Sequence, residues 1–243
     1  MIEGLYSAAA GMAAQQVQLD AISNDLANLS TSGYKSERVA FSDLLYSKVD
    51  EEGTETTTGA GARAEILGTS QSQGSIEETG NPLDLAIEGP GYLQVTRSDG
   101  SRALTRNGAL ELDAEGSLTT PEGDRLYPPV KVPAGVSASK IGISSDGTVT
   151  ARGKTVGKID LVAVTSPGHL LGEGSSLLSA NAQSGEPHAA TDAKLRQGAL
   201  ESSNVDVGRD MATMMSTERD FQMASTAIQT ESQMMSIANQ LRS

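Results

Sequence analysis

The sequence predicts an α+β protein in which helices at the two ends of the chain pair as a coiled coil and the middle forms a mainly antiparallel β domain. Three observations support this prediction. Apolar residues recur at steps of three and four at both ends, turn-forming dipeptides recur regularly in the middle, and all eight methionines lie in the terminal segments. The two ends are therefore expected to pair with each other and with copies of themselves.

Residues 2–29 are predicted to form one helix. Its apolar face has the approximate 3.5-residue period of a coiled-coil seam, formed by Ile2, Leu5, Ala9, Met12, Leu19, Ile22, Leu26 and Leu29. Small residues between positions 8 and 14 would let a neighbouring helix approach closely. The helix is expected to end at residues 30–33, a turn-forming cluster that closes with a glycine.

Two amide side chains, Asn24 and Asn28, lie one turn apart on this largely apolar helix. Amides at a helical seam can fix the register of packing at some cost in stability, which makes both residues candidates for a subunit interface. The alternative is that both side chains simply face water.

Residues 206–241 are predicted to form the second helix. Asn204 or Asp206 is placed to cap it, and the carboxylate of Asp210 suits the positive dipole of the first turn. Methionines at helical spacing ordinarily fill a core, but two long thin helices cannot bury their apolar faces in one pair, so this core is predicted to be intermolecular. The recurring apolar positions are Met211, Met214, Met215, Phe221, Ala224, Ile228, Met235, Ala238 and Leu241.

The chain between the helices is predicted to change character near Ala64. Residues 34–46 carry few periodic signals and are expected to be extended, with a short helix near Phe41 to Tyr46. Residues 50–62 are polar and rich in Gly and Thr, which predicts a mobile loop. The predicted regions are a polymerising helical domain (1–30 with 206–243), an extended bridging segment with a loop (31–63) and a β-rich outer domain (64–205).

Turn dipeptides mark the β domain. Residues 86–95 are predicted to form a strand, a tight turn and a second strand, residues 140–150 a further unit, and residues 158–164 the strongest strand. Such pairs favour two-residue hairpin turns in which both central residues have positive φ, so a meander, sandwich or barrel is expected. The pairs are Asp99-Gly100, Asn107-Gly108, Glu115-Gly116 and Glu122-Gly123.

Composition excludes several classes of protein. The net charge of −13 argues against a nucleic-acid partner, because phosphate contacts need Lys and Arg. The chain has no cysteine, and no run reaches the roughly 18 apolar residues of a membrane span. The first positive charge is Lys35, so no signal-peptide n-region is expected. The protein is predicted to stay in the cytosol or to be exported by a route without a cleaved signal.

No motif for catalysis, metal binding or cofactor binding is expected. His169 and His188 lie in loop-forming sequence without partners at ligand spacing, and Gly89-Pro90-Gly91 lacks the Lys-Ser/Thr of a phosphate loop. The carboxylates could supply an acid/base pair, as in a glycan hydrolase, but most are explained as turn residues or as an acidic surface.

Four sequence motifs resemble those of the bacterial flagellar rod and hook proteins. They are residues 20–35 (Asp-Ala-Ile-Ser-Asn-Asp-Leu-Ala-Asn-Leu-Ser-Thr-Ser-Gly-Tyr-Lys), 81–95, 104–108 (Leu-Thr-Arg-Asn-Gly) and 201–207 (Glu-Ser-Ser-Asn-Val-Asp-Val). Asp25 stands where the family usually has Asn. The motifs follow one another in the family's order and span nearly the whole chain. The pattern is most similar to the distal rod subunit, with the proximal rod subunit next and a hook-type subunit of the same family as a further alternative.

This resemblance implies a structural function. In this family the terminal helices of many subunits form an inner tube around an export channel, the β domain forms the outer layer, and the segment after the first helix bridges neighbouring subunits. The implied partners are copies of the chain itself, the other rod proteins, the hook protein, the flagellar type III export apparatus and an outer ring bushing. The implied location is the rod of the basal body, in the periplasmic or cell-wall space.

The expected interface residues follow from the helices and the family motifs. They are Leu5, Met12, Leu19, Ile22, Asn24, Leu26, Asn28, Asn204, Met211, Met214, Phe221, Ile228 and Met235. Two other classes remain as alternatives: a secreted β-rich cell-wall hydrolase, which would need a carboxylate pair in a cleft, and a β-structured adhesin, which would stay monomeric with ordered ends.

Overall fold

The structure is a computed structural model that describes residues 2–49 and 55–240. The chain divides into two compact units. We call the first the helical unit, composed of Met1–Leu26, Glu37–Leu67 and Asp206–Ser243. The second, the body, is composed of Ala27–Ser36 and Gly68–Val205.

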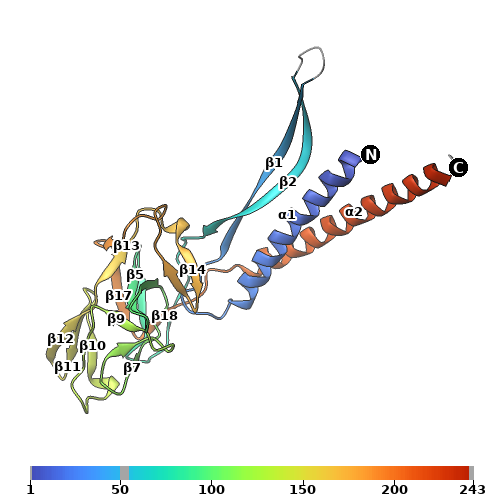
Figure 1. Cartoon of the computed structure of the whole chain (residues 1–243). Helices are drawn as coiled ribbons and strands as arrows, with labels where there is room; N and C mark the ends of the chain where they lie inside the picture. Colours follow the sequence, from blue (N-terminus) through green and yellow to red (C-terminus); the bar gives the residue numbers. More distant parts are fainter. Residues whose placement is uncertain (1, 50–54, 241–243) are drawn as a thin grey trace. The chain divides into compact units, whose positions relative to one another are not determined.

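The helical unit contains the two long helices, α1 (Ile2–Ala27) and α2 (Val207–Gln240). Both predicted helices are confirmed, and they lie against each other. They are antiparallel, since their N- and C-terminal ends lie together in Figure 1 and a Cβ added at Gly4 would lie 3.4 Å from a carboxylate oxygen of Glu231. Asp206 caps α2, because its Oδ1 accepts a hydrogen bond of 3.1 Å from the backbone N–H of Arg209.

A long two-stranded hairpin completes the helical unit: β1 (Glu37–Val49) and β2 (Glu55–Thr69). The short helix predicted near Phe41 to Tyr46 is therefore wrong, and β structure begins well before Ala64. The predicted loop at 50–62 falls partly on residues 50–54, outside the described part of the chain, but residues 55–62 belong to β2. The β-branched threonines 56–58 favour a strand over a loop.

The body is built from antiparallel sheets, as predicted. Its largest sheet has nine strands in the order β14-β15-β6-β5-β9-β8-β7, with β13 between β5 and β16. The members are β5 (Tyr92–Thr96), β6 (Arg102–Thr105), β7 (Glu111–Leu112), β8 (Leu118–Thr119), β9 (Arg125–Tyr127), β13 (Leu161–Ala163), β14 (Leu171–Gly174), β15 (Leu177–Ser179) and β16 (His188–Ala189).

Three smaller sheets complete the body. One contains β10, β11 and β12, and the others pair β4 with β17 and β3 with β18. The strands are β3 (Ile76–Glu78), β4 (Leu85–Glu88), β10 (Ile141–Ile143), β11 (Thr148–Ala151), β12 (Lys154–Lys158), β17 (Lys194–Gln197) and β18 (Ala199–Glu201). Two 3₁₀ turns, Ala138–Lys140 and Pro167–His169, lie between strands.

Three of the four predicted turn pairs form hairpins, but of a different type. The N–H groups of Gly100, Gly116 and Gly123 each bond the carbonyl three residues earlier, and only the glycine of each pair has positive φ. These are type I turns followed by a glycine, a common alternative to the predicted two-residue turn. Asn107-Gly108 joins β6 to β7 without a hairpin, because Gly108 packs against the backbone of Leu85.

Two strand predictions are corrected in detail. The strands on either side of Gly89-Pro90-Gly91 exist but belong to different sheets, since β4 pairs with β17 and β5 pairs with β6, β9 and β13. The predicted strand at 158–164 is divided between β12 and β13, because the backbone N–H of Ile159 bonds the carbonyl of Gly147.

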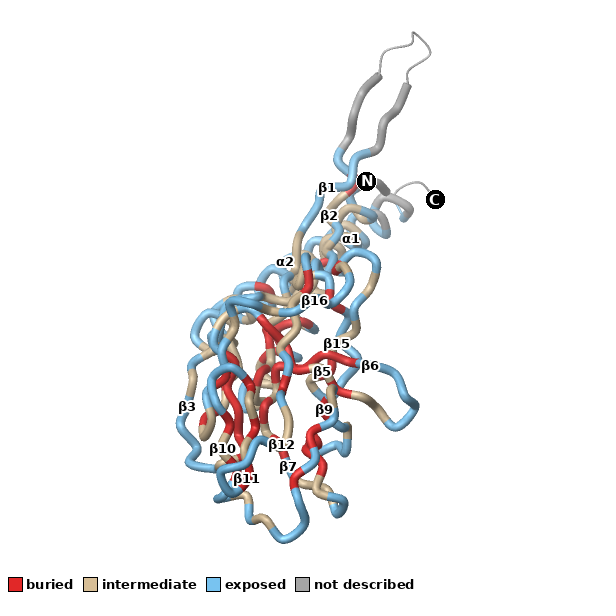
Figure 2. The backbone as a smooth tube through the Cα atoms, turned by 90° about the vertical axis from the view of Figure 1, so that its left-hand side faces the viewer, coloured by how far each residue is buried: buried red, intermediate tan, exposed pale blue. Residues whose placement is uncertain are grey.

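The hydrophobic core lies in the body, where Figure 2 shows most of the buried positions. It is built from aliphatic side chains of several sheets, including Leu85, Ile87, Leu93, Val95 and Val149, each no more than 1% exposed. A smaller cluster surrounds Tyr92 and Leu104 on the opposite side of β5 and β6. The body thus has the buried core of an independently folded unit.

Candidate functional site

The helix α1 is buried along a face that matches the predicted apolar face only in part. Its buried apolar side chains are Ala14, Ala21 and Ile22. Only Ile22 belongs to the predicted face; at about 100° per residue the two alanines lie on the other side of the helix, where their small side chains allow close packing. The other predicted interface residues of this helix are half-buried: Leu5, Met12, Leu19 and Leu26. Among the large apolar side chains described on α1, Tyr6 is exposed, at 68%.

The helix α2 has apolar side chains on two opposite faces. At about 100° per residue, its exposed large apolar residues fall within an arc of about 140°, which we call the outer face. These are Met211, Met215, Met223, Met234 and Ile237. The inner face lies on the other side of the helix and is more buried; it contains Met214, Thr217, Phe221 and Ile228. The side chain of Met235 lies outside the described part of the chain.

The two helix amides make local contacts. The Nδ2 of Asn24 donates to Oε1 of Glu37 at 3.0 Å, and the Oδ1 of Asn28 accepts from the hydroxyl of Thr31 at 3.2 Å. Asp25, between them, is buried, and its Oδ1 accepts from the backbone N–H of Glu37. The register role predicted for the two amides is compatible with these contacts and stays a prediction.

The hairpin of β1 and β2 exposes large apolar side chains: Phe41, Leu44, Leu45, Ile66 and Leu67. The hairpin also approaches α1, where Gly61 lies so close that an added Cβ would be 2.8 Å from Cβ of Ala10. Both strands pair only with each other, among the described residues. An isolated two-stranded sheet is marginally stable in water, so the exposed apolar side chains of this hairpin form a second candidate interaction surface.

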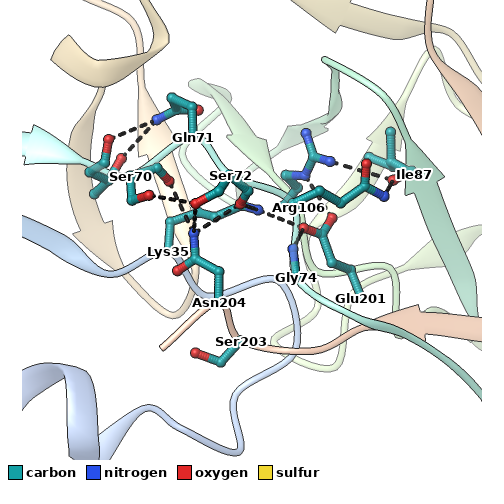
Figure 3. Close-up of polar contacts among 12 residues, drawn as sticks. Lys35, Ser70, Gln71, Ser72, Gly74, Ile87, Arg106, Glu201, Ser203 and Asn204 are labelled. Carbon is teal, nitrogen blue, oxygen red and sulfur yellow. Dashed lines mark hydrogen bonds and ion pairs between the residues drawn. The ribbon is translucent and has the colours of Figure 1, made fainter. Parts of the chain in front are cut away.

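The body contains a buried ionic cluster, which we define as Lys35, Arg106, Glu201 and Asn204 (Figure 3). Glu201 is 1% exposed and accepts three hydrogen bonds: from Nζ of Lys35 at 2.5 Å, from Nε of Arg106 at 2.8 Å and from the backbone N–H of Gly74 at 2.9 Å. Two positive groups thus share one carboxylate, and each has further partners.

Arg106 anchors the turn between β4 and β5. Its guanidinium donates to the carbonyl oxygens of Gly91 at 3.0 Å, Gly89 at 3.0 Å and Ile87 at 3.4 Å. Gln73 binds the same turn through Ile87 and Gly89. The carbonyl oxygens of this turn therefore accept hydrogen bonds from the buried guanidinium of Arg106. Without these bonds the carbonyl groups would be costly to bury.

Lys35 and Asn204 bind the segment that follows β2. The Nζ of Lys35 donates to the carbonyl oxygen of Ser72 at 2.7 Å, and the Nδ2 of Asn204 donates to the same oxygen at 2.9 Å. The Oδ1 of Asn204 accepts from the backbone N–H of Ser36 at 2.8 Å. Asn204 was predicted as an interface or capping residue; here its described contacts lie inside the body.

Burial and charge shift the ionisation of this cluster. Burial lowers the pKa of Lys35, although its hydrogen bond to Glu201 acts in the other direction. Burial also opposes the charged form of Glu201, but the hydrogen bond from Lys35 and the charge of Arg106 outweigh it and hold the pKa of Glu201 below its ordinary value. The Glu201 carboxylate, which accepts hydrogen bonds from Lys35, Arg106 and Gly74, therefore stays charged and has a structural role.

All four sequence motifs meet at this cluster. Lys35 ends the first motif, the carbonyls of residues 87–91 lie in the second, Arg106 is in the third, and Glu201 and Asn204 are in the fourth. The sequence did not single out the three charged residues as a site. A charged residue inside the first, third and fourth motifs was the available signal, but the convergence of these residues depends on contacts between positions up to 166 apart.

The described residues offer little for catalysis. No group of three His, Asp or Glu side chains among them is arranged to hold a metal ion, and His169 and His188 are exposed. No helix in this part of the chain has the length and apolarity needed to cross a membrane. The most distinctive features of the described residues are the outer face of α2, the exposed apolar side chains of the hairpin of β1 and β2, and the ionic cluster.

Comparison with known families gives three matches in sequence order. A model described as "Flagella basal body rod protein" matches residues 5–35, one described as "Flagellar hook protein FlgE/F/G D1 domain" matches residues 86–151, and one described as "Flagellar basal body rod FlgEFG protein C-terminal" matches residues 196–241. The first match covers most of the first predicted helix, the third contains the second predicted helix, and the second match lies in the body.

Curated relatives match over the full length. A flagellar basal-body rod protein FlgG from Borreliella burgdorferi is 34% identical over 263 residues, covering 100% of this chain and 99% of the relative. The protein of the same name from Caulobacter vibrioides is 33% identical, with 100% of both chains covered. A "Flagellar hook-basal body complex protein FlhP" from Bacillus subtilis is 32% identical, also with 100% of both chains covered.

Proposed function

We propose a mechanism that starts from an established premise: the chain belongs to the flagellar basal-body rod protein family, as a structural subunit similar to the relatives named FlgG. It is not an enzyme, and its place is the basal-body rod, where it assembles with other rod and hook proteins. In the proposed mechanism the chain polymerises helically through its terminal helices into a hollow shaft, which transmits motor torque to the hook.

The two apolar faces of α2 are the observation that carries this proposal. One helix packed on α1 needs a single apolar face, yet α2 has a second one that the chain leaves exposed. Covering it would contribute roughly 1 kcal/mol for each half-exposed side chain at about 25 cal/mol per Å². A second copy of the chain is the occupant that would bury this surface in every subunit.

A helical polymer follows from repeating such a contact. When one surface of a subunit binds a different surface of the next, and the rotation does not close a ring, the result is an open helical filament. Leu5, Met12 and Leu19 of α1, with Ile22 and Leu26, are proposed to pack against Met214, Phe221, Ile228 and Met235 of α2 in the assembled shaft. Asn24 and Asn28 are proposed to set the register.

The hairpin of β1 and β2 supplies a second contact. The face of β1 that carries the exposed Phe41 and Leu45 is proposed to lie on a neighbouring subunit and so to bridge subunits around the shaft. The finer partners are also proposals. The chain would leave the cell unfolded through the flagellar type III apparatus, without a cleaved signal, and an outer ring would surround the shaft.

Negative-stain microscopy of the concentrated full-length protein tests this function. Wild-type chain is expected to form rods of helical symmetry, and a variant with Met215→Glu and Met223→Glu on the outer face is expected to remain monomeric with unchanged helix content. Leu171→Glu on β14 is the matched control, since Leu171 is similarly exposed at 56% but lies in the body. Rods formed by the double variant would refute the role of the outer face.

A further inference from the structure

The chain passes between the helical unit and the body at four points. They are the bonds 26–27, 36–37, 67–68 and 205–206. Any torque exchanged between the two units must travel through these four segments or through surface contacts. The contacts that hold the body-side end of each segment therefore affect how the subunit transmits torque.

Hydrogen bonds tie these body-side ends to one another. Ser36, at the second crossing, donates its N–H to Oδ1 of Asn204 and accepts at its carbonyl a bond of 2.7 Å from the N–H of Ser70. Asn204, one residue before the last body residue, donates to the carbonyl oxygens of Ser70 and Ser72. The ends of the second, third and fourth crossings are thus bonded directly.

The first crossing is joined through Gly33, six residues after Ala27. Its backbone N–H donates to the carbonyl oxygen of Glu201 at 2.7 Å. Lys35, two residues further along the chain, donates to both Glu201 and Ser72. Arg106 fastens Glu201 to the turn between β4 and β5, and so to the core sheets of the body.

We propose that the ionic cluster is a torsion clamp: it ties the body-side ends of all four crossings into one block, so that torque is shared among them and no single segment bends alone. The proposal rests on the proposed function, because it assumes a subunit of a rotating shaft. Directional bonds suit such a clamp better than apolar packing does. Ion pairs and amide bonds fix orientation as well as distance, whereas buried ion pairs add little net stability over an apolar core.

Lys35→Met is the sharpest test, because it removes two bonds of the clamp and leaves Arg106 and Glu201 as a balanced pair. Asn204→Ala is a second variant that removes no charge. Arg196→Met is the control, since Arg196 pairs with Glu78 on the exposed surface of the body. In hydrogen exchange of the full-length protein, we expect both clamp variants to raise the exchange rates at Ser36 and Gly74 at least tenfold, with β5 and β6 unchanged.

Swimming under load gives the functional readout, in cells whose own copy of the gene is replaced by each variant. The clamp variants are expected to assemble flagella and to swim at the control speed in dilute buffer, but to lose at least half of that speed in viscous medium. Undiminished speed at high load, despite faster exchange, would overturn the proposal, as would unchanged exchange or a failure to assemble. Failure of wild-type chain to polymerise would instead overturn the proposed function.

Discussion

At the residue scale, Gly33 accepts no larger side chain without strain. Its φ is +71°, and an added Cβ would lie 2.5 Å from the carbonyl carbon of Arg106. Gly33→Ala is therefore expected to lower the free energy of unfolding by about 3 kcal/mol or more, from the positive φ and the backbone clash together. Urea denaturation of the full-length chain measures it.

Gly100→Ala is the matched comparison. Its φ is +84°, but open space surrounds the position where a Cβ would stand. Only the conformational cost remains, so a loss of about 1 kcal/mol is expected. If both variants lowered the free energy of unfolding equally, the close approach of Gly33 to Arg106 would not contribute to stability.

Glu201 gives a pH-dependent prediction. Its pKa is lowered in the folded state, so the stability that its charge supplies is fully present above its ordinary pKa of about 4.5 and is lost as the pH falls through the lowered value. Glu201→Gln leaves Lys35 and Arg106 buried without their anion, which is expected to cost about 3–5 kcal/mol at pH 7. The difference from wild type should shrink as the pH falls below 4.5.

Denaturation curves at pH 7 and at pH 4 or below test this prediction, with Glu78→Gln as the control. Glu78 pairs with Arg196 at the surface, and exposed pairs contribute at most about 1 kcal/mol. A destabilisation by Glu201→Gln that stays constant over this pH range would mean that packing, not charge, explains the loss.

At the scale of single elements, the hairpin can be tested apart from the helices. Replacing Phe41 and Leu45 with serine removes exposed apolar surface, so the isolated chain should keep its unfolding temperature within a few degrees. Assembly should need at least tenfold more protein, because the bridging contact is weakened. Light scattering against protein concentration measures this threshold, and Arg63→Gln, an exposed change on β2, should leave it unaltered.

The elements also show what can be predicted from sequence. The helices were predictable because period and capping are local, and Asp206 caps α2 as its residue type suggests. The hairpin was not, because its glycines and polar residues are typical of loops, although its threonines at 56–58 favour a strand. The division between β12 and β13 and the conformation of Asn107-Gly108 depend on contacts from distant residues, namely Gly147 and Leu85. The buried cluster was out of reach for the same reason.

At the scale of the whole molecule, the two units differ in how they treat apolar surface. The body has its own core and its own polar cluster, whereas the helical unit exposes apolar surface on α2 and on the hairpin. This division implies that solubility and folding of the body are separable from polymerisation. In the proposed shaft, the ends of the chain would carry the polymer contacts and the body would form the outer layer.

Removing residues 1–29 tests that division directly. The deletion takes away α1 but leaves Gly33 and Lys35, so the cluster and the core of the body are intact. The truncated chain is expected to unfold cooperatively and to sediment as a monomer at concentrations where the full chain polymerises. Monomer is expected because α2 loses the partner of its inner face and the polymer loses half of its helical contacts. Filaments of the truncated chain in analytical ultracentrifugation or microscopy would contradict assembly through paired terminal helices and would place the polymer contacts in the body.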